Sequence, residues 1–312
     1  MQEKGLKKLL SSKAVPYIAG GSVAFFWASA FPATKYGLQY YTPEALTLFR
    51  FLIAAAVLLG YCAWKKIPPP EKKDLPLFAV AGFFGQFLYM WAFSVGTYFV
   101  PSGVSSFIIS SAPIFALILS IAFLKERAGF IIWLGVLTSF AGLAIISLMQ
   151  GGYFQLNIGT LLLLVASIST SIFTVIQRRL VERYSAIQAS TYSVAFGTLF
   201  MFIFFPMLIR EIPYAPMHVN LMVVYLGIFP AALAYFFWSL ALSKAKKTVY
   251  VTSFMYLVPF IASIIAFFWL GERLSILTLI GGAIIITGMV ITNLKKSEES
   301  AEAERFDNIS KK

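Results

Sequence analysis

The sequence predicts an all-α membrane protein whose ten transmembrane helices form two five-helix repeats of opposite orientation. Three observations lead to this fold class: the composition, the distribution of Lys and Arg between apolar stretches, and an internal repeat. Of the 312 residues, 59% are hydrophobic and 12% are charged, and the mean hydropathy is +0.82. Soluble domains carry about 25% charged residues, so this chain has too few charges to cover a surface in water.

Long apolar stretches recur along the chain and are separated by short links that are polar or contain proline. Each stretch has about 20 residues or more, enough for a helix to cross the ~30 Å hydrocarbon core. The expected helices are 15–34, 43–64, 75–97, 101–124, 129–149, 157–177, 186–209, 219–242, 248–270 and 275–294. The expected regions are a cytoplasmic N-terminal segment 1–14, repeats 15–150 and 157–294, and a charged cytoplasmic tail 295–312.

The basic residues predict how these helices are oriented. With the N-terminus in the cytoplasm, 21 of the 25 Lys and Arg residues fall on cytoplasmic segments and three on external links. Such an excess is typical of multi-pass membrane proteins. We therefore expect both termini in the cytoplasm and the chain in the plasma membrane. The net charge of +12 is spread over separate links, which argues against a nucleic-acid partner.

An internal repeat relates the two halves of the chain. A shift of 146 residues matches Pro113 to Pro259, Glu126 to Glu272, Arg127 to Arg273, Gly135 to Gly281, Gly142 to Gly288, and Tyr89 to Tyr235. Five is an odd number of helices, so the second copy enters the membrane from the opposite side. Inverted repeats can expose a site at the membrane midplane to each side in turn. The repeat therefore predicts a transporter of small molecules.

Two segments carry a family resemblance. Gly271-Glu272-Arg273-Leu274, followed by Gly281, resembles the second EamA domain of the drug/metabolite transporter superfamily. The run from Trp27 to Phe31, with Lys35 and Leu48-Phe49-Arg50-Phe51, resembles the first. The resemblance covers about residues 15–294 and implies a ten-helix transporter of amino acids, nucleosides or related metabolites. The first copy has Lys125 where the second has Gly271, so we expect the turn there to differ in backbone shape.

Polar and aromatic side chains within the spans are the candidates for a substrate cavity. Aromatic rings can clamp an apolar group, and hydroxyl groups can orient an amino or carboxyl group. The candidates are Trp27, Ser29, Gln86, Tyr89, Ser106, Ser110, Ser169, Phe173, Tyr235, Trp238, Ser253 and Tyr256. Aromatic residues make up 17% of the chain, so many other rings must face lipid.

Arg50 is the clear ionisable residue inside an expected span. A charged residue within a membrane helix is a candidate for function. Two structural alternatives stay open, because a long arginine side chain can reach outward to the interface or bond to neighbouring carbonyl groups.

The repeated residues Pro113 and Pro259 are expected near the middle of their spans. A proline there removes a helical hydrogen bond, which favours a packing kink and leaves a hinge at the substrate site open. The pairs Glu126-Arg127 and Glu272-Arg273 are expected to close tight hairpins through capping or a local ion pair, with gating as the alternative. The four repeated glycines are assigned to close helix packing, with a homodimer contact left open.

Other function classes find little support. One Cys and one His leave no zinc site, and we expect neither a metal nor a cofactor. A membrane-embedded enzyme would need a nucleophile motif or a buried pair of acids, and the sequence has neither Gly-x-Ser-x-Gly nor His-Glu-x-x-His. A ligand sensor without transport is the other alternative. The leading hypothesis is a metabolite transporter, with export of an amino acid or related compound favoured.

Overall fold

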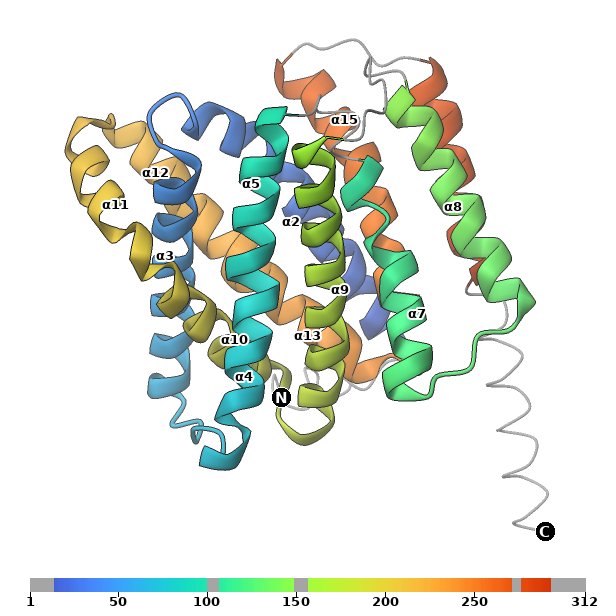
Figure 1. The fold of residues 1–312 in the computed structure, drawn as a ribbon, viewed down its shortest axis with the longest axis horizontal. Helices are drawn as coiled ribbons and strands as arrows, with labels where there is room; N and C mark the ends of the chain where they lie inside the picture. The colour runs from blue at the N-terminus through green and yellow to red at the C-terminus, as the bar shows by residue number, and fades with distance from the viewer. Residues whose placement is uncertain (1–13, 100–106, 149–156, 271–275, 293–312) are drawn as a thin grey trace, which may run out of the picture.

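The computed structural model describes residues 14–99, 107–148, 157–270 and 276–292 (Figure 1). Every regular element within these residues is a helix, so the predicted all-α class is confirmed. Six helical stretches are long and apolar enough to cross a membrane by length and composition, and three further apolar helices are shorter. The count of ten membrane helices stays a prediction.

The first half of the chain contains α2 (Val15–Gly37), α3 (Pro43–Trp64), the 3-10 turn η1 (Lys72–Asp74), α4 (Leu75–Gly82), the π-helical segment η2 (Phe83–Leu88), α5 (Tyr89–Phe99), α7 (Ala112–Leu124) and α8 (Phe130–Leu148). The second half begins with α9 (Ile158–Arg183), α10 (Ala186–Met201), η3 (Phe202–Phe204), α11 (Phe205–Glu211), η4 (Ile212–Tyr214) and α12 (Met217–Leu226). It continues with the π-helical segment η5 (Gly227–Leu233), α13 (Ala234–Lys244), α14 (Val249–Thr252), the 3-10 segment η6 (Ser253–Tyr256), α15 (Leu257–Leu270) and a last helix, Ile276–Thr292.

Several helices begin where a polar side chain can satisfy their free N–H groups. Thr42 precedes α3 and its hydroxyl accepts a hydrogen bond from the Ala45 N–H. Ser185 and Gln188 form a reciprocal capping box at the start of α10. Because such caps satisfy donors that have no partner within the helix, the short polar links define where these helices start.

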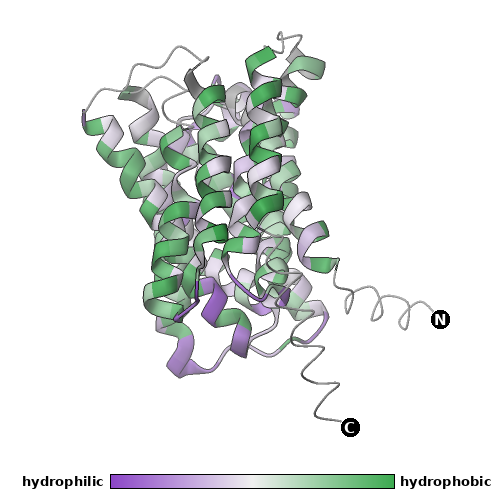
Figure 2. Ribbon diagram, turned by 90° about the vertical axis from the view of Figure 1, so that its right-hand side faces the viewer, coloured by the Kyte–Doolittle hydropathy of each residue, from purple (hydrophilic) through white to green (hydrophobic). Residues whose placement is uncertain are grey.

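The links between helices lie at two opposite ends of the bundle. Those after α3, α7, α9 and α13 lie at one end, and those after α2 and α11 lie at the other (Figure 1). Figure 2 shows hydrophilic residues gathered at the first end and hydrophobic residues along the outer faces of the helices. Large apolar side chains such as Phe130, Ile203 and Phe268 are exposed there, as expected for faces that contact lipid.

Four glycines bring α8 and the last helix into close contact, and we call these residues the glycine seam: Gly135, Gly142, Gly281 and Gly288. A Cβ at Gly142 would lie 2.6 Å from the Gly281 carbonyl oxygen, and a Cβ at Gly135 would lie 2.6 Å from that of Gly288. The packing role of these glycines is therefore an intramolecular one. The two helices lie side by side in Figure 1.

Several expected spans are interrupted helices. The π-helical segments η2 and η5 separate α4 from α5 and α12 from α13. A shift of 146 residues carries η2 to 229–234, which overlaps η5. Local composition gave little indication of either segment beyond Pro230 within η5, because a π-helix differs from an α-helix by a single extra residue in one turn.

Both prolines lie just after a change of helical conformation within their expected spans, and their role as a kink or a hinge stays a prediction. Pro113 is the second residue of α7, after a turn at 110–111, and Pro259 is the third residue of α15, after η6. The first turn of a helix tolerates proline because its N–H would lack a helical partner there. Ser171 on α9 donates a hydrogen bond of 2.9 Å to the Ala112 carbonyl beside the break, so a neighbouring helix supports it.

Candidate functional site

Tyr235 is the centre of a buried group of aromatic rings between the two halves. It is 5% exposed and follows η5 directly on α13. The rings of Trp27, Phe51 and Phe173 meet it edge-on, with centroids at 6.0, 5.9 and 5.8 Å. Its hydroxyl donates a 3.3 Å hydrogen bond to the Gly85 carbonyl in η2. Helices α2, α3, α9 and α13 therefore meet at one residue, together with η2.

The missing side chain of Gly85 makes room for this arrangement. A Cβ at this position would overlap the Phe173 ring. That ring could not then pack against Tyr235 as it does. Gly85 thus leaves room for the Phe173 ring, and its carbonyl accepts the hydrogen bond of the Tyr235 hydroxyl.

Arg50 lies beside these rings on α3. Its guanidinium carbon is 5.5 Å from the centroid of the Phe51 ring, and Tyr89 and Tyr235 lie within electrostatic range of it. Arg50 is 7% exposed, so it does not extend outward to the interface. Its Nε is buried and has no hydrogen-bond partner within the described residues. We call Trp27, Arg50, Phe51, Phe173 and Tyr235 the Tyr235 cluster.

Trp27 of the cluster and its neighbour Trp238 differ in how their N–H groups are used. Trp27 donates a 3.2 Å hydrogen bond to the Pro230 carbonyl in η5. The Trp238 ring is tilted relative to that of Trp27, with centroids 5.3 Å apart, and is 1% exposed; its Nε1 has no partner within the described residues. Two buried donors of this region, Arg50 Nε and Trp238 Nε1, therefore have no hydrogen-bond acceptor within the described residues. A buried polar group without a partner is unfavourable.

Gln86 and Tyr89 are brought to the same region but have different surroundings. Gln86 is fully buried, and its amide nitrogen, in the orientation that satisfies the site, donates to the carbonyls of Gly82 and Ser193 at 3.2 Å. It therefore joins η2 to α10. Tyr89 stacks on Phe93 at 6.1 Å and lies near Arg50.

The predicted serines mostly bond to backbone or tyrosine groups. Ser169 donates to the Phe84 carbonyl at 2.8 Å, and Ser253 to the Tyr250 carbonyl at 3.3 Å. Ser29 lies 2.7 Å from the Tyr225 hydroxyl.

The remaining candidates lie apart from the Tyr235 cluster. Ser110 is buried in the turn before α7, and Tyr256 packs in a separate core with Leu143 and Ile285. Ser106 lies outside the described residues. The structure thus brings together Trp27, Arg50, Gln86, Tyr89, Phe173, Tyr235 and Trp238.

The Glu126 carboxylate binds a residue of the other half. It accepts hydrogen bonds from the Thr248 N–H at 2.9 Å and from the Thr248 hydroxyl at 2.6 Å. This contact caps the start of α14, whereas a cap within its own hairpin was expected. Arg127 is exposed beside it, and the counterparts Glu272 and Arg273 lie outside the described residues.

Lys125 takes a left-handed backbone conformation in this hairpin, whereas its counterpart Gly271 lies outside the described residues. The φ of Lys125 is 56°, in the left-handed region, where a residue with a Cβ is strained and glycine is not. The turn of the first copy therefore takes a backbone shape that suits the glycine found at the matching position of the second copy.

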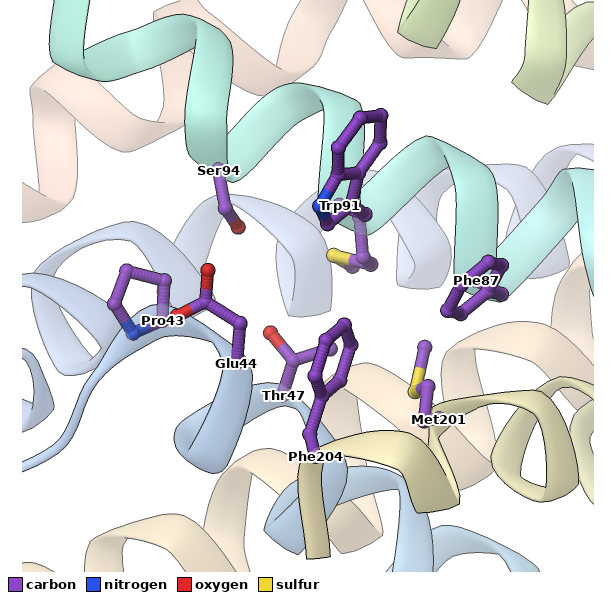
Figure 3. A pocket seen from close by; sticks show the side chains of 9 residues that line it. Pro43, Glu44, Thr47, Phe87, Trp91, Ser94, Met201 and Phe204 are labelled. Carbon is purple, nitrogen blue, oxygen red and sulfur yellow. The ribbon is translucent and has the colours of Figure 1, made fainter. Parts of the chain in front are cut away.

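A small, partly open pocket with a cavity volume of about 10 Å³ lies between α3, α5 and η3 (Figure 3). Glu44 and Thr47 from α3 and Trp91 and Ser94 from α5 line it, with Phe204 opposite. Trp91 and Phe204 were absent from the predicted cavity, because single aromatic residues in an aromatic-rich membrane sequence give no indication of facing a pocket.

Comparison with known proteins identifies the chain. The model of the EamA-like transporter family matches it twice, at residues 15–148 and 157–294. The chain belongs to the EamA-like transporter family. It is 37% identical over 278 residues to the uncharacterized transporter YdfC of Bacillus subtilis (strain 168), a match that spans 86% of this chain and 88% of that protein.

A second EamA relative has a more specific name. The chain is 31% identical over 277 residues to a probable terminal-alkyne amino-acid exporter of Streptantibioticus cattleyicolor, with 89% of this chain and 93% of that protein covered. A solved crystal structure shares the fold with a TM-score of 0.75 at 19% identity, over 91% of this chain and 98% of that one. The chain is therefore a membrane transporter with two EamA domains.

Proposed function

We propose that this EamA protein exports a small metabolite, an amino acid or a related compound, across the plasma membrane by alternating access of two inverted five-helix repeats. The observation that carries the mechanism is the pairing within the glycine seam. Gly135 approaches Gly288, and Gly142 approaches Gly281. A shift of 146 residues relates Gly135 to Gly281 and Gly142 to Gly288. Exchanging the two halves therefore turns the Gly135–Gly288 contact into the Gly281–Gly142 contact. Such reciprocal pairs are typical of a twofold axis.

Contacts between other helices support the same relation. Helix α2 packs on α13 and α5 packs on α9, and these two interfaces are equivalents when the halves are exchanged. The Ser139 hydroxyl donates to the carbonyl of Ile285, its own partner under the 146-residue shift, at 3.2 Å. A residue that meets its equivalent lies on the axis itself. Two units around such an axis can rock to open a central site to either side.

The substrate class rests on weaker support. One relative is named as an exporter of a terminal-alkyne amino acid at 31% identity, and the Tyr235 cluster offers rings and a cation to such a molecule. A counterflow assay in proteoliposomes against a panel of amino acids and related metabolites tests the proposal. We expect saturable flux for at least one member. Binding without flux would favour a sensor, and chemical conversion of a solute would favour an enzyme.

The inversion has its own test. In a Cys62→Ser background, Arg127→Cys and Arg273→Cys are each labelled with a membrane-impermeant thiol reagent added from one side of the membrane. We expect Arg127→Cys to react only from the cytoplasm and Arg273→Cys only from outside. Labelling of both from the same side would contradict inverted repeats and termini that share the cytoplasm. Homodimer formation stays a prediction.

A further inference from the structure

Arg50 is a buried cation that forms no ion pair with any carboxylate in the part of the chain that the structure describes. A buried charge is strongly unfavourable unless it is paired. The groups within electrostatic range of the guanidinium among the described residues are the tyrosines Tyr89 and Tyr235. Neither is an anion at neutral pH.

The described carboxylates are engaged at other places. The contacts are Glu71 with Lys73, Asp74 with Arg183, Glu182 with Arg178, Glu126 with Thr248, and Glu211 with Thr42. The sixth, Glu44, lines the pocket of Figure 3. It is six residues before Arg50 on α3, or about 9 Å along the helix axis. The other carboxylates of the sequence lie outside the described residues.

We propose that Arg50 binds the carboxylate of the transported solute, so that the solute itself supplies the missing counter-charge. A guanidinium donates two parallel N–H bonds to a carboxylate, a geometry that an ammonium group cannot reproduce. One guanidinium matches one monoanion. The inference rests on the proposed transport function and narrows its substrates to small monocarboxylates, with the apolar part of the solute against the rings of the Tyr235 cluster.

The position of Arg50 suits such a role. The cluster joins α2 and α3 of the first half to α9 and α13 of the second, so a relative movement of the halves changes the space beside the guanidinium. Trp238 Nε1 adds a second buried donor without a partner within the described residues. A bound carboxylate has two oxygens and can accept several hydrogen bonds, so the solute can accept bonds from other donors as well as from Arg50.

The test measures binding separately from flux. The purified full-length protein is titrated with each common L-amino acid, with acetate and butyrate, and with the matching amino-acid amides, which lack the negative charge. We expect a saturable rise in Tm for at least one carboxylate and none for its amide. We also expect Arg50→Gln to weaken that carboxylate about 30-fold or more, and Arg50→Lys to weaken it less.

Lys65→Gln is the matched control, because it removes one positive charge from an exposed residue that lies 4.0 Å from the Trp64 ring. It should bind like the wild type. If Arg50→Gln fails to fold, the test relies on whether the wild-type protein binds a carboxylate and not its amide. The inference is overturned if no carboxylate stabilises the wild type, if acid and amide bind alike, or if folded Arg50→Gln binds normally.

The two proposals can fail independently. Proteoliposomes of the same protein are loaded with the probes that bind. Carboxylate binding that depends on Arg50 without any flux would contradict transport and retain the site. Saturable flux with equal rates for acids and their amides would retain transport and remove Arg50 as the group that selects the solute.

Discussion

The glycine seam and the Tyr235 cluster are both contacts between the halves, and they are built in opposite ways. In the seam, backbone meets backbone: a Cβ at Gly142 would lie 2.6 Å from one backbone atom and 2.9 Å from another. In the cluster, large rings meet edge-on around Tyr235, and the Arg50 guanidinium lies over one of them, Phe51. Close backbone packing leaves nothing that can adjust, whereas ring stacks can shift by rotation of side chains. The difference suggests a fixed pivot at the seam and a mobile contact at the cluster.

The largest expected effect is in the seam. Gly142→Ala should destabilise the protein by about 2–3 kcal/mol, because the new methyl group meets backbone atoms that cannot rotate away. Thermal unfolding in detergent measures the loss. Gly21→Ala is the control, since a Cβ there meets no atom within 4 Å. If Gly142→Ala lowers the melting temperature no more than Gly21→Ala does, the glycine seam is not the rigid contact proposed.

A glycine-to-alanine substitution in the cluster should cost less stability than one in the seam. Gly85→Ala presses on the Phe173 ring, and a ring can turn, so we expect a loss of about 1 kcal/mol. Transport should fall more than stability, since Phe173 must leave its contact with Tyr235. The measurement pairs a melting curve with counterflow. A stability loss as large as that of Gly142→Ala would mean that the cluster is as rigid as the seam.

The two tryptophans sharpen the description of the cluster. Trp27→Phe removes the hydrogen bond to the Pro230 carbonyl and should cost about 1 kcal/mol. Trp238→Phe removes an N–H without a partner within the described residues, so any loss should come from ring size alone and be offset by the lost polar group. Denaturation of the two variants side by side measures the difference. Equal losses would show that the Trp238 N–H has a partner in the folded protein.

The smallest expected effect lies outside both contacts. Lys125→Gly should stabilise the protein by about 0.5–1 kcal/mol, because Lys125 holds a left-handed φ of 56° that is strained for residues with a Cβ. Lys125→Ala removes the same charge and keeps the strain, so it serves as the control. Equal melting temperatures for the two variants would contradict a strained turn.

Much of the site could be anticipated from residue types. A buried arginine among aromatic residues in an apolar chain is unusual enough to be selected, and Arg50, Trp27, Tyr89, Phe173 and Tyr235 were all selected and lie together. The serines were chosen on the same basis, yet Ser29 and Ser253 donate to carbonyls three residues earlier, a local bond that helical hydroxyls readily make, and Ser169 donates to the Phe84 carbonyl of η2. Local sequence cannot tell these two outcomes apart.

Other features depend on contacts between distant residues. Glu126 was expected to cap its own hairpin, yet it binds Thr248, 122 residues later. Phe51 and Gly85 join the cluster only because α3 and η2 meet α13. The helix break before Pro113 is supported by Ser171 of α9, which donates to the Ala112 carbonyl. Each depends on which helices become neighbours, and no local pattern encodes that.

The sequence by itself determined that this chain is an apolar, all-helical protein, which residues repeat after 146 positions, and which end of the bundle collects the basic links. Those properties follow from composition, spacing and charge, which act along the chain. The tertiary structure alone decided that the repeated glycines meet each other across α8 and the last helix, and that Arg50 is buried beside Tyr235 with no carboxylate of the described residues paired to it. Both depend on distances between helices, and burial and pairing exist only once the helices have packed.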